Sequence, residues 1–153
     1  MVEVYHFMPD QMFARIIDGK PIYSSVIVVK VSDHARIHIA GQVAVGPDGD
    51  VLSKGGMRAQ IRQVCKCIRA GLEHVGANFS DVVRTVTYTT DVDEYFRCQE
   101  VRFEYFAHPA PTSTLLGVTR LADPNFLVEI EAEAIIGLDR LRLPTNRGMN
   151  GTG

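Results

Sequence analysis

The sequence lacks long apolar runs and shows no excess of charge of one sign. Hydrophobic residues make up 46% and charged residues 22% of the 153 positions, the balance of an ordinary soluble globular domain. The longest apolar runs, such as Val26–Val29, are far too short to span a bilayer. Sixteen basic and 18 acidic residues give a formal net charge of −2. We therefore expect no membrane span, and nucleic acid is an unlikely partner.

Cysteine is also scarce, with only Cys65, Cys67 and Cys98. The spacing of the first two fits neither a zinc knuckle nor a redox CxxC motif. We expect three reduced, buried thiols and no disulfide. The opening residues, MVEVYHFMPD, have neither the basic nor the apolar region of a signal peptide, so we expect a cytoplasmic protein.

The common catalytic and cofactor motifs are missing as well. There is no P-loop, GxGxxG, HExxH, nucleophile elbow or zinc-binding spacing. The histidines have no partner motif, which favours structural or surface roles for all five; they are His6, His34, His38, His74 and His108. We expect neither a metal nor a cofactor.

Hydrophobic periodicity predicts an alternation of strands and helices. Apolar residues recur every three or four positions in the first helix, and alternate or are β-branched in the strands. The predicted strands are one edge strand at Val2–Phe7 or Ala14–Ile17, then Val26–Val31, Arg36–Val45, Ser80–Val92, a strand within residues 109–118, and Phe126–Ile136. The predicted helices are Met57–Val75 and Asp93–Phe106.

This order predicts an α+β sandwich in which two helices cover one face of a mixed sheet. No sequence remains to cover the other face, so we infer an oligomer. The composition changes at Gly137, which predicts one domain over residues 1–136 and a loose extension over 137–153.

Two polar patterns lie on the predicted elements. The first is a basic stripe along the first helix, interpreted as a solvated face rather than an anion or RNA contact; its members are Arg58, Arg62, Lys66 and Arg69. The second is a row of three carboxylates, Glu129, Glu131 and Glu133, on one face of the last strand. Like charges in a row repel, so that face must meet water, cations or a polar cavity. The strand at Arg36–Val45 alternates too: its side chains are expected to fall into Ile37, Ile39 and Gly41 on one face and His38, Ala40 and Gln42 on the other.

Four segments together resemble the RidA/YjgF family, also described as L-PSP endoribonucleases or enamine/imine deaminases. They are AGQVAVGPDGDV, RAQIRQVCKCIRAGLEHVGANFSDVVRTVTYTTDVDEY, QEVRFEYF and LVEIEAEA, and the similarity runs from about Tyr23 to Ile136. The resemblance implies a chorismate-mutase-like homotrimer with three clefts between subunits. It also implies cofactor-independent hydrolysis of small reactive imines or enamines, bound in those clefts, to carbonyl compounds and ammonia.

The resemblance also assigns residues. In active members an arginine opens the strand after the second helix and binds the substrate carboxylate as a fork; Ser113 stands there in this chain. Glu129 matches the glutamate that places or activates water, and the Leu115 carbonyl matches an assisting backbone carbonyl. The other matched positions are Gly41 and Gln42 of a Gly-Gln pair, Gln99 in place of an asparagine, and Tyr23.

Without the arginine, two interpretations remain. In the first, the cleft still binds a carboxylate, using backbone N–H groups and the hydroxyls of Thr112, Ser113 and Thr114. Arg102 would then supply the charge, because it lies one helical turn after Gln99. In the second, the cleft takes a less anionic or aromatic ligand, since losing a bidentate charged contact costs roughly 2–5 kcal/mol.

Three functions follow from the sequence. The leading hypothesis is an enamine/imine deaminase-type hydrolase with Glu129 as the group that positions water. The second is a non-catalytic trimer that binds a small metabolite in the same clefts. The third, a ribonuclease or translation inhibitor, is disfavoured by the net charge and by the lack of an aromatic-basic surface.

Overall fold

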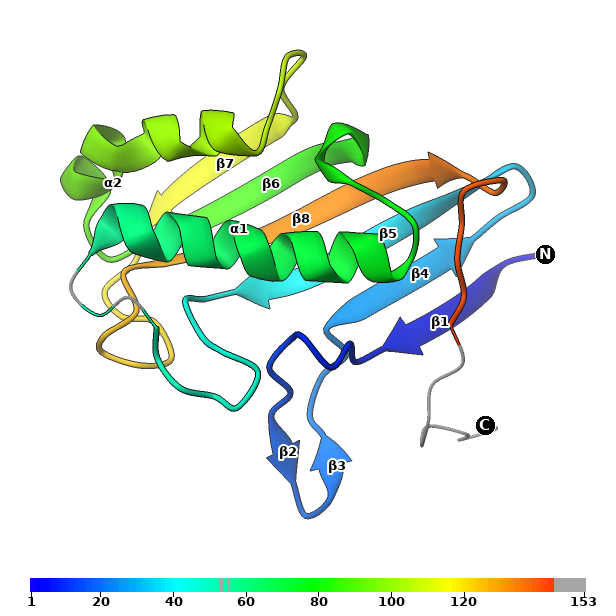
Figure 1. Ribbon diagram of the computed structural model, residues 1–153, viewed down its shortest axis with the longest axis horizontal. Coiled ribbons are helices and arrows are strands. Elements are labelled where there is room, and N and C mark those ends of the chain that lie inside the picture. Colours follow the sequence, from blue (N-terminus) through cyan, green and yellow to red (C-terminus); the bar gives the residue numbers. More distant parts are fainter. Residues whose placement is uncertain (53, 55, 145–153) are drawn as a thin grey trace.

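A six-stranded mixed sheet forms the centre of the computed structural model, which describes residues 1–52, 54 and 56–144 (Figure 1). The strands of this sheet are β1 (Glu3–Phe7), β4 (Val26–Lys30), β5 (His34–Gln42), β6 (Val82–Thr89), β7 (Thr112–Gly117) and β8 (Val128–Gly137). Two further short strands, β2 (Ile16–Ile17) and β3 (Lys20–Pro21), pair only with each other. The helical elements are α1 (Met57–His74), η1 (Phe79–Asp81), α2 (Val92–Cys98) and η2 (Gln99–Glu104), of which η1 and η2 are 3₁₀ helices.

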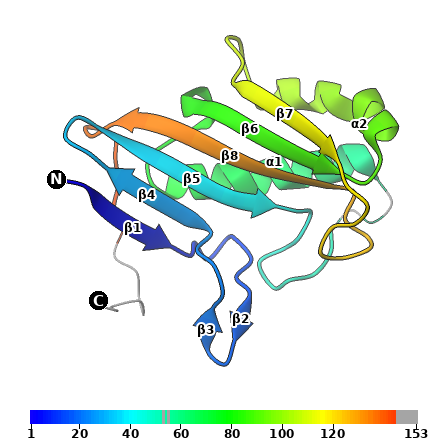
Figure 2. The same ribbon diagram turned by 180° about the vertical axis from the view of Figure 1, so that it is seen from behind.

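The strands lie in the order β1-β4-β5-β8-β6-β7, and only the pair β6–β7 is parallel. Both α-helices cover one face, and the view from behind shows the opposite face open along its whole width (Figure 2). The predicted α+β architecture, with two helices on one face of a mixed sheet, is confirmed.

The core lies between α1 and the central strands. On β8, Val128, Ile130, Ala132 and Ala134 alternate with the glutamates and are all buried. The matching stripe of α1 is buried too, and it consists of Met57, Ile61, Val64, Ile68 and Leu72. The buried stripe of α1 and the buried face of β8 therefore belong to one core, as the sequence pattern predicts.

The second predicted helix is shorter than its pattern suggests. Asp91 caps α2 by accepting a hydrogen bond from the Glu94 N–H at 2.9 Å. The α-helix ends at Cys98, and the chain continues as the 3₁₀ helix η2 rather than as an α-helix to Phe106. The buried residues Cys98 and Val101 are three positions apart, which is the repeat of a 3₁₀ helix.

The N-terminal segment contains both of the alternative strands that the sequence suggested. Val2–Phe7 contains β1, which pairs with β4, and Ala14–Ile17 contains β2. The turn between β2 and β3 has positive φ at Asp18 (50°) and Gly19 (76°), as a type I′ hairpin requires. The β2–β3 hairpin projects from the body of the protein (Figures 1 and 2).

The residues after β8 contact the body of the domain. Arg140 forms an ion pair with Asp81 at 2.7 Å, and the Arg142 N–H donates to the Val75 carbonyl at 3.0 Å. Leu138 and Leu141 pack against the core. The predicted loose extension is thus held against the body over residues 138–142, and residues 145–153 lie outside the described part of the chain.

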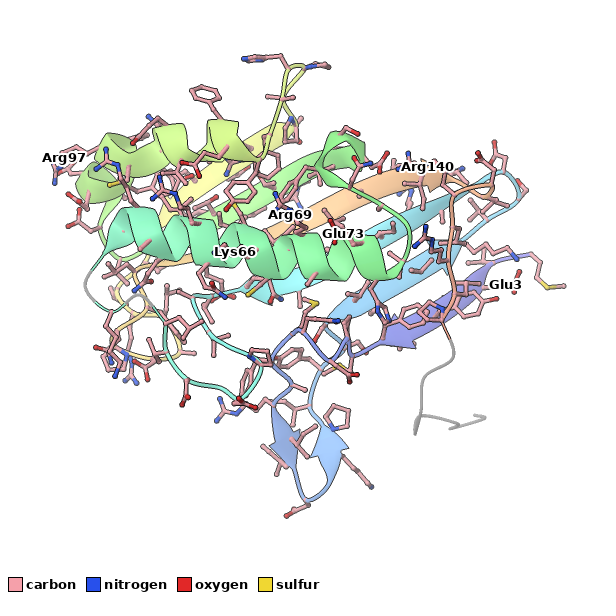
Figure 3. The ribbon with its side chains drawn as sticks, viewed as in Figure 1. Glu3, Lys66, Arg69, Glu73, Arg97 and Arg140 are labelled. Atoms are coloured by element: carbon pink, nitrogen blue, oxygen red, sulfur yellow. The ribbon has the colours of Figure 1, made fainter. Side chains whose placement is uncertain are left out.

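The basic stripe of α1 faces away from the sheet, as Lys66 and Arg69 show in Figure 3. Arg58 pairs with Glu100 and Arg62 with Glu104, both at 2.7 Å. Arg69 lies over the rings of Phe79 and Tyr105. Three of the four basic side chains therefore hold neighbouring elements against α1. All four basic side chains are exposed, so the interpretation of the stripe as a solvated face is correct.

The three cysteines are buried and free, and burial raises the pKa of the Cys65 thiol to about 12. No helix in the described part of the chain is long and apolar enough to cross a membrane.

Candidate active site

A β-bulge brings Gly41 next to Glu129. Ile39 pairs with Ala132 and Gln42 with Ile130, so three steps on β5 match two on β8. A β-carbon built on Gly41 would collide with Glu129 Oε1 and lie 3.0 Å from Cδ. Only a glycine leaves room for the carboxylate against the β5 backbone at this point.

The bulge corrects the predicted faces of β5. Alternation placed Gly41 with Ile37 and Ile39, but the extra residue turns Gly41 to the open face, toward Glu129. It also turns Gln42 to the helix-covered face, where its side chain is 7% exposed. Gln42 Nε2 donates to the Ala40 carbonyl at 2.8 Å, which leaves only the Gln42 backbone for the predicted ligand contact.

Glu129 faces a cavity of about 440 Å³. The cavity lies where β5 ends and β8 begins, beside the base of the β2–β3 hairpin, and the loop after β5 runs next to that hairpin in both ribbon views (Figures 1 and 2). Apolar side chains form most of its wall, among them Phe13, Val43, Val51 and Phe126. Its polar groups are Arg15, Tyr23, Asp123 and Glu129. An apolar pocket with a few convergent polar groups is the usual form of a small-molecule site.

The three glutamates of β8 have different surroundings. Arg84 pairs with Glu133 at 3.2 Å and approaches Glu131 at 3.9 Å, and the Tyr88 hydroxyl donates to Glu131 at 3.4 Å. Glu129 has no ion pair within the described part of the chain. Burial, and then repulsion from Glu131, raise the pKa of Glu129 above its ordinary value. An unpaired carboxylate with a raised pKa in a cavity is suited to accept a proton.

Tyr23 lies within the electrostatic reach of both Glu129 and Arg15. Burial raises the pKa of the Tyr23 hydroxyl, and Glu129 adds to the shift, while a backbone hydrogen bond and the charge of Arg15 oppose it. The phenol therefore stays protonated at neutral pH and can donate a hydrogen bond inside the cavity. The predicted residues Tyr23, Gly41 and Glu129 are thus brought together by the fold.

Buried hydrogen bonds fix the segment that leads into β8. Gln60, a fully buried residue of α1, donates to the Asn125 carbonyl at 2.7 Å and accepts from the Leu127 N–H at 2.8 Å. The Thr89 hydroxyl donates to the Leu127 carbonyl at 2.8 Å. These contacts position Phe126 on the cavity wall and set the register of Glu129 two residues later.

Three of the other predicted site residues, Arg102, Ser113 and Leu115, form a second group on the helix-covered side of β6 and β7. The guanidinium of Arg102 donates to Thr85 Oγ1 at 3.0 Å and lies 3.4 Å from Thr87 Oγ1. It also lies over the Phe106 ring, 4.7 Å from the centroid. Ser113 pairs with Thr85 and Leu115 with Thr87. Arg102 therefore lies against β6, the strand that pairs with the β7 strand of Ser113, and it pairs with no carboxylate of the described residues.

The remaining predicted site residues, Thr112, Thr114 and Gln99, lie near this second group and not at Glu129. Thr112 and Thr114 face the open side of β7, next to Arg84 and Val86 of β6 in the pairing. Gln99 is exposed at the start of η2. Two strand spacings, roughly 10 Å, separate β7 from β8. Within one chain the second group does not reach the Glu129 cavity.

Sequence reasoning missed Arg15, Phe13 and Asp123 as cavity residues. The Asp-Gly pair at positions 18–19 is a recognisable hairpin signal, but it does not reveal which side chain lies against a strand more than 100 residues away. Within the described part of the chain, no three His, Cys, Asp or Glu side chains lie together as a metal site.

Comparison with known proteins identifies a family for this chain. The family model described as Endoribonuclease L-PSP matches residues 18–136. A RutC family protein of Pyrococcus abyssi is 34% identical over 115 residues, which cover 75% of this chain and 88% of the relative. The human 2-iminobutanoate/2-iminopropanoate deaminase is 29% identical over 115 residues, 75% of this chain and 80% of the human protein.

Solved structures share the fold. RidA from an Antarctic Psychrobacter bacterium superposes with a TM-score of 0.71 at 27% identity, covering 86% of this chain and 99% of that one. A putative endoribonuclease from Thermotoga maritima gives a TM-score of 0.72 at 27% identity, covering 86% and 97%. The chain therefore belongs to the L-PSP endoribonuclease family, the RidA/YjgF family that its sequence motifs resemble.

Proposed function

We propose that this protein is a cofactor-independent deaminase that hydrolyses small imines or enamines to carbonyl compounds and ammonia. The observation that carries the proposal is the unpaired Glu129 carboxylate, held in an apolar cavity with its pKa raised. The similarity to a human 2-iminobutanoate/2-iminopropanoate deaminase supports the reaction class.

The chemistry needs a base and little else. A protonated imine carbon is already electrophilic, so water attacks it once Glu129 accepts a proton from that water. The resulting carbinolamine gains a proton on nitrogen and loses one from oxygen, and ammonia departs as the C=O bond forms. The overall reaction, R₂C=NH + H₂O → R₂C=O + NH₃, balances without a cofactor. The protonated Tyr23 hydroxyl can donate to the oxygen or nitrogen during these transfers.

A homotrimer would complete the site. The cavity group (Tyr23, Gly41 and Glu129) and the β7 group (Gln99, Arg102 and Thr112–Leu115) are separate within one chain. The open sheet face carries exposed apolar side chains, including Val83, Leu116 and Ile135, which suit burial against another subunit. A neighbouring chain packed on that face would bring its β7 group to the Glu129 cavity. We retain the cytoplasm as the proposed location.

The two other functions are separable from this one. A binding module would use the same cavity without turnover. Ribonuclease activity, which the family description suggests, finds less support because Arg58 and Arg62 are engaged with Glu100 and Glu104.

The test follows a 2-imino acid as it is formed. An amino-acid oxidase generates 2-iminobutanoate in the presence of semicarbazide, which traps the imine. The protein is expected to reduce trapping in proportion to its concentration and, in a parallel assay without semicarbazide, to release ammonia faster than the buffer does. Binding of the corresponding 2-oxo acid without faster ammonia release would indicate the binding module. Cleavage of RNA with a steep salt dependence would indicate the ribonuclease.

A further inference from the structure

Arg15 lies in the cavity wall at the base of the β2–β3 hairpin. Its carbonyl accepts a hydrogen bond from the Ile22 N–H at 3.1 Å, which ties the two sides of the hairpin together just before β2. The side chain is exposed, yet it forms part of the cavity wall together with Tyr23 and Glu129. The hairpin therefore places this cationic residue in the cavity wall.

No ion pair in the described part of the chain engages the Arg15 guanidinium, so it can bind an anionic ligand. Among the described residues that form the wall, Arg15 is the only basic one. Asp123, the carboxylate of the wall other than Glu129, accepts hydrogen bonds from the Asn125 N–H at 2.8 Å and from the Asn125 Nδ2 at 2.9 Å.

Arg15, Tyr23 and Glu129 line the same cavity. Arg15 and Glu129 act on the Tyr23 hydroxyl with opposite effects, whereas Arg15 is absent from the causes that shift Glu129. The cavity wall therefore carries one cationic side chain, one phenolic hydroxyl and the carboxylates of Asp123 and Glu129. A ligand with one acidic group and one electrophilic C=N or C=O carbon matches this polarity, and the apolar wall matches a hydrocarbon chain.

We propose that Arg15 binds the carboxylate of the substrate, so that the reacting carbon is presented to Glu129. The proposal rests on the function proposed above and specifies its ligand class: small 2-imino acids, and the 2-oxo acids they yield, with an apolar side chain. It assigns the anion contact to the hairpin of the same chain, rather than to Arg102, whose guanidinium is held by Thr85 and Thr87.

A binding experiment tests Arg15 without turnover. Saturation-transfer NMR on the full-length protein compares 2-oxobutanoate with butanone, which has the same carbon chain and carbonyl but no carboxylate. Wild-type protein is expected to bind 2-oxobutanoate and not butanone. Arg15→Gln is expected to weaken 2-oxobutanoate binding about 10- to 100-fold, and Arg15→Lys to restore part of it. Lys20→Gln, which removes the same charge from the same hairpin outside the cavity, is the matched control and is expected to bind as wild type.

The outcomes separate the alternatives. Equal binding of butanone, unchanged binding by Arg15→Gln, or a loss confined to Arg102→Gln would each overturn the assignment. So would an absence of 2-oxobutanoate binding by the wild-type protein. If Arg15-dependent binding is found but ammonia is not released from 2-iminobutanoate, Arg15 is the carboxylate-binding residue and the proposed reaction is wrong.

Discussion

The Glu129 carboxylate packs against Gly41, in the space that a side chain at position 41 would fill. A β-carbon there would be 3.0 Å from Glu129 Cδ and 3.1 Å from Cγ. The β-bulge in β5 creates this contact by turning Gly41 toward β8. The shape of the backbone at Gly41 therefore decides where the proposed base can lie.

Substituting Gly41→Ala should displace Glu129 from its position and lower kcat/KM for 2-iminobutanoate by about 100-fold, because catalytic groups tolerate little misplacement. The φ of Gly41 is not in the left-handed region, so the variant should fold. Gly56→Ala is the control, since its added methyl would meet only Ala59 at 3.6 Å. Full activity in Gly41→Ala would show that the carboxylate need not lie there.

Glu129→Gln should make the folded protein more stable at pH 7. The pKa of Glu129 is raised in the folded state, so folding favours the protonated form. The stability from this group is complete below the unfolded pKa and is lost as pH rises through the folded pKa. Removing the charge should therefore raise Tm at pH 7, where roughly 2–4 °C corresponds to 1 kcal/mol, and have no effect near pH 3.

Glu133→Gln serves as the comparison for that measurement. Its carboxylate pairs with Arg84 at 3.2 Å on a half-exposed surface, and such pairs contribute about 0–1 kcal/mol. Thermal unfolding should show no stabilisation in Glu133→Gln. A lower Tm at pH 7 for Glu129→Gln would contradict the raised pKa.

The charge of Glu131 should influence the pH at which kcat/KM falls on acidification. A base must be ionised, so kcat/KM should fall on acidification through the pKa of Glu129. Repulsion from Glu131 raises that pKa. Glu131→Gln should therefore move the acid limb to lower pH, while Glu133→Gln, which is not among the causes of the shift, should leave it in place. An unmoved limb in Glu131→Gln would mean that another group titrates.

The open sheet face should mediate trimer formation. Light scattering should give a mass about three times the 16.9 kDa of the chain. Ile135→Lys places a charge on the open face, where Ile135 is 40% exposed, and should shift the mass to that of the monomer. Phe103→Lys changes a residue that is 74% exposed on η2 and should leave the trimer intact. A monomeric wild-type protein would refute the intersubunit cleft.

Much of the fold was predictable because periodicity reports burial directly. Ile61, Val64 and Ile68 repeat at the spacing of one helical face, and Val128 and Ile130 alternate with glutamates, so α1 and β8 follow from the sequence. The same alternation placed Glu129 and Glu131 on the open face correctly.

Other features depend on tertiary contacts that alternation does not contain. A β-bulge adds one residue to a strand without changing the hydrophobic pattern, so the faces of Gly41 and Gln42 were predicted wrongly. The 3₁₀ segment after Cys98 keeps apolar residues at spacings that an α-helix also allows. Arg15 joins the cavity only because the base of the β2–β3 hairpin lies beside the end of β5 and the start of β8.

The comparison of Glu129→Gln with Glu133→Gln in the ammonia-release assay on 2-iminobutanoate tests the central claim most directly. If Glu129 is the base, the first substitution should lower the protein-catalysed rate by about 10²- to 10⁴-fold, and the second should leave it within about twofold of wild type. A Glu129→Gln protein that still releases ammonia at the wild-type rate would contradict this account of the site.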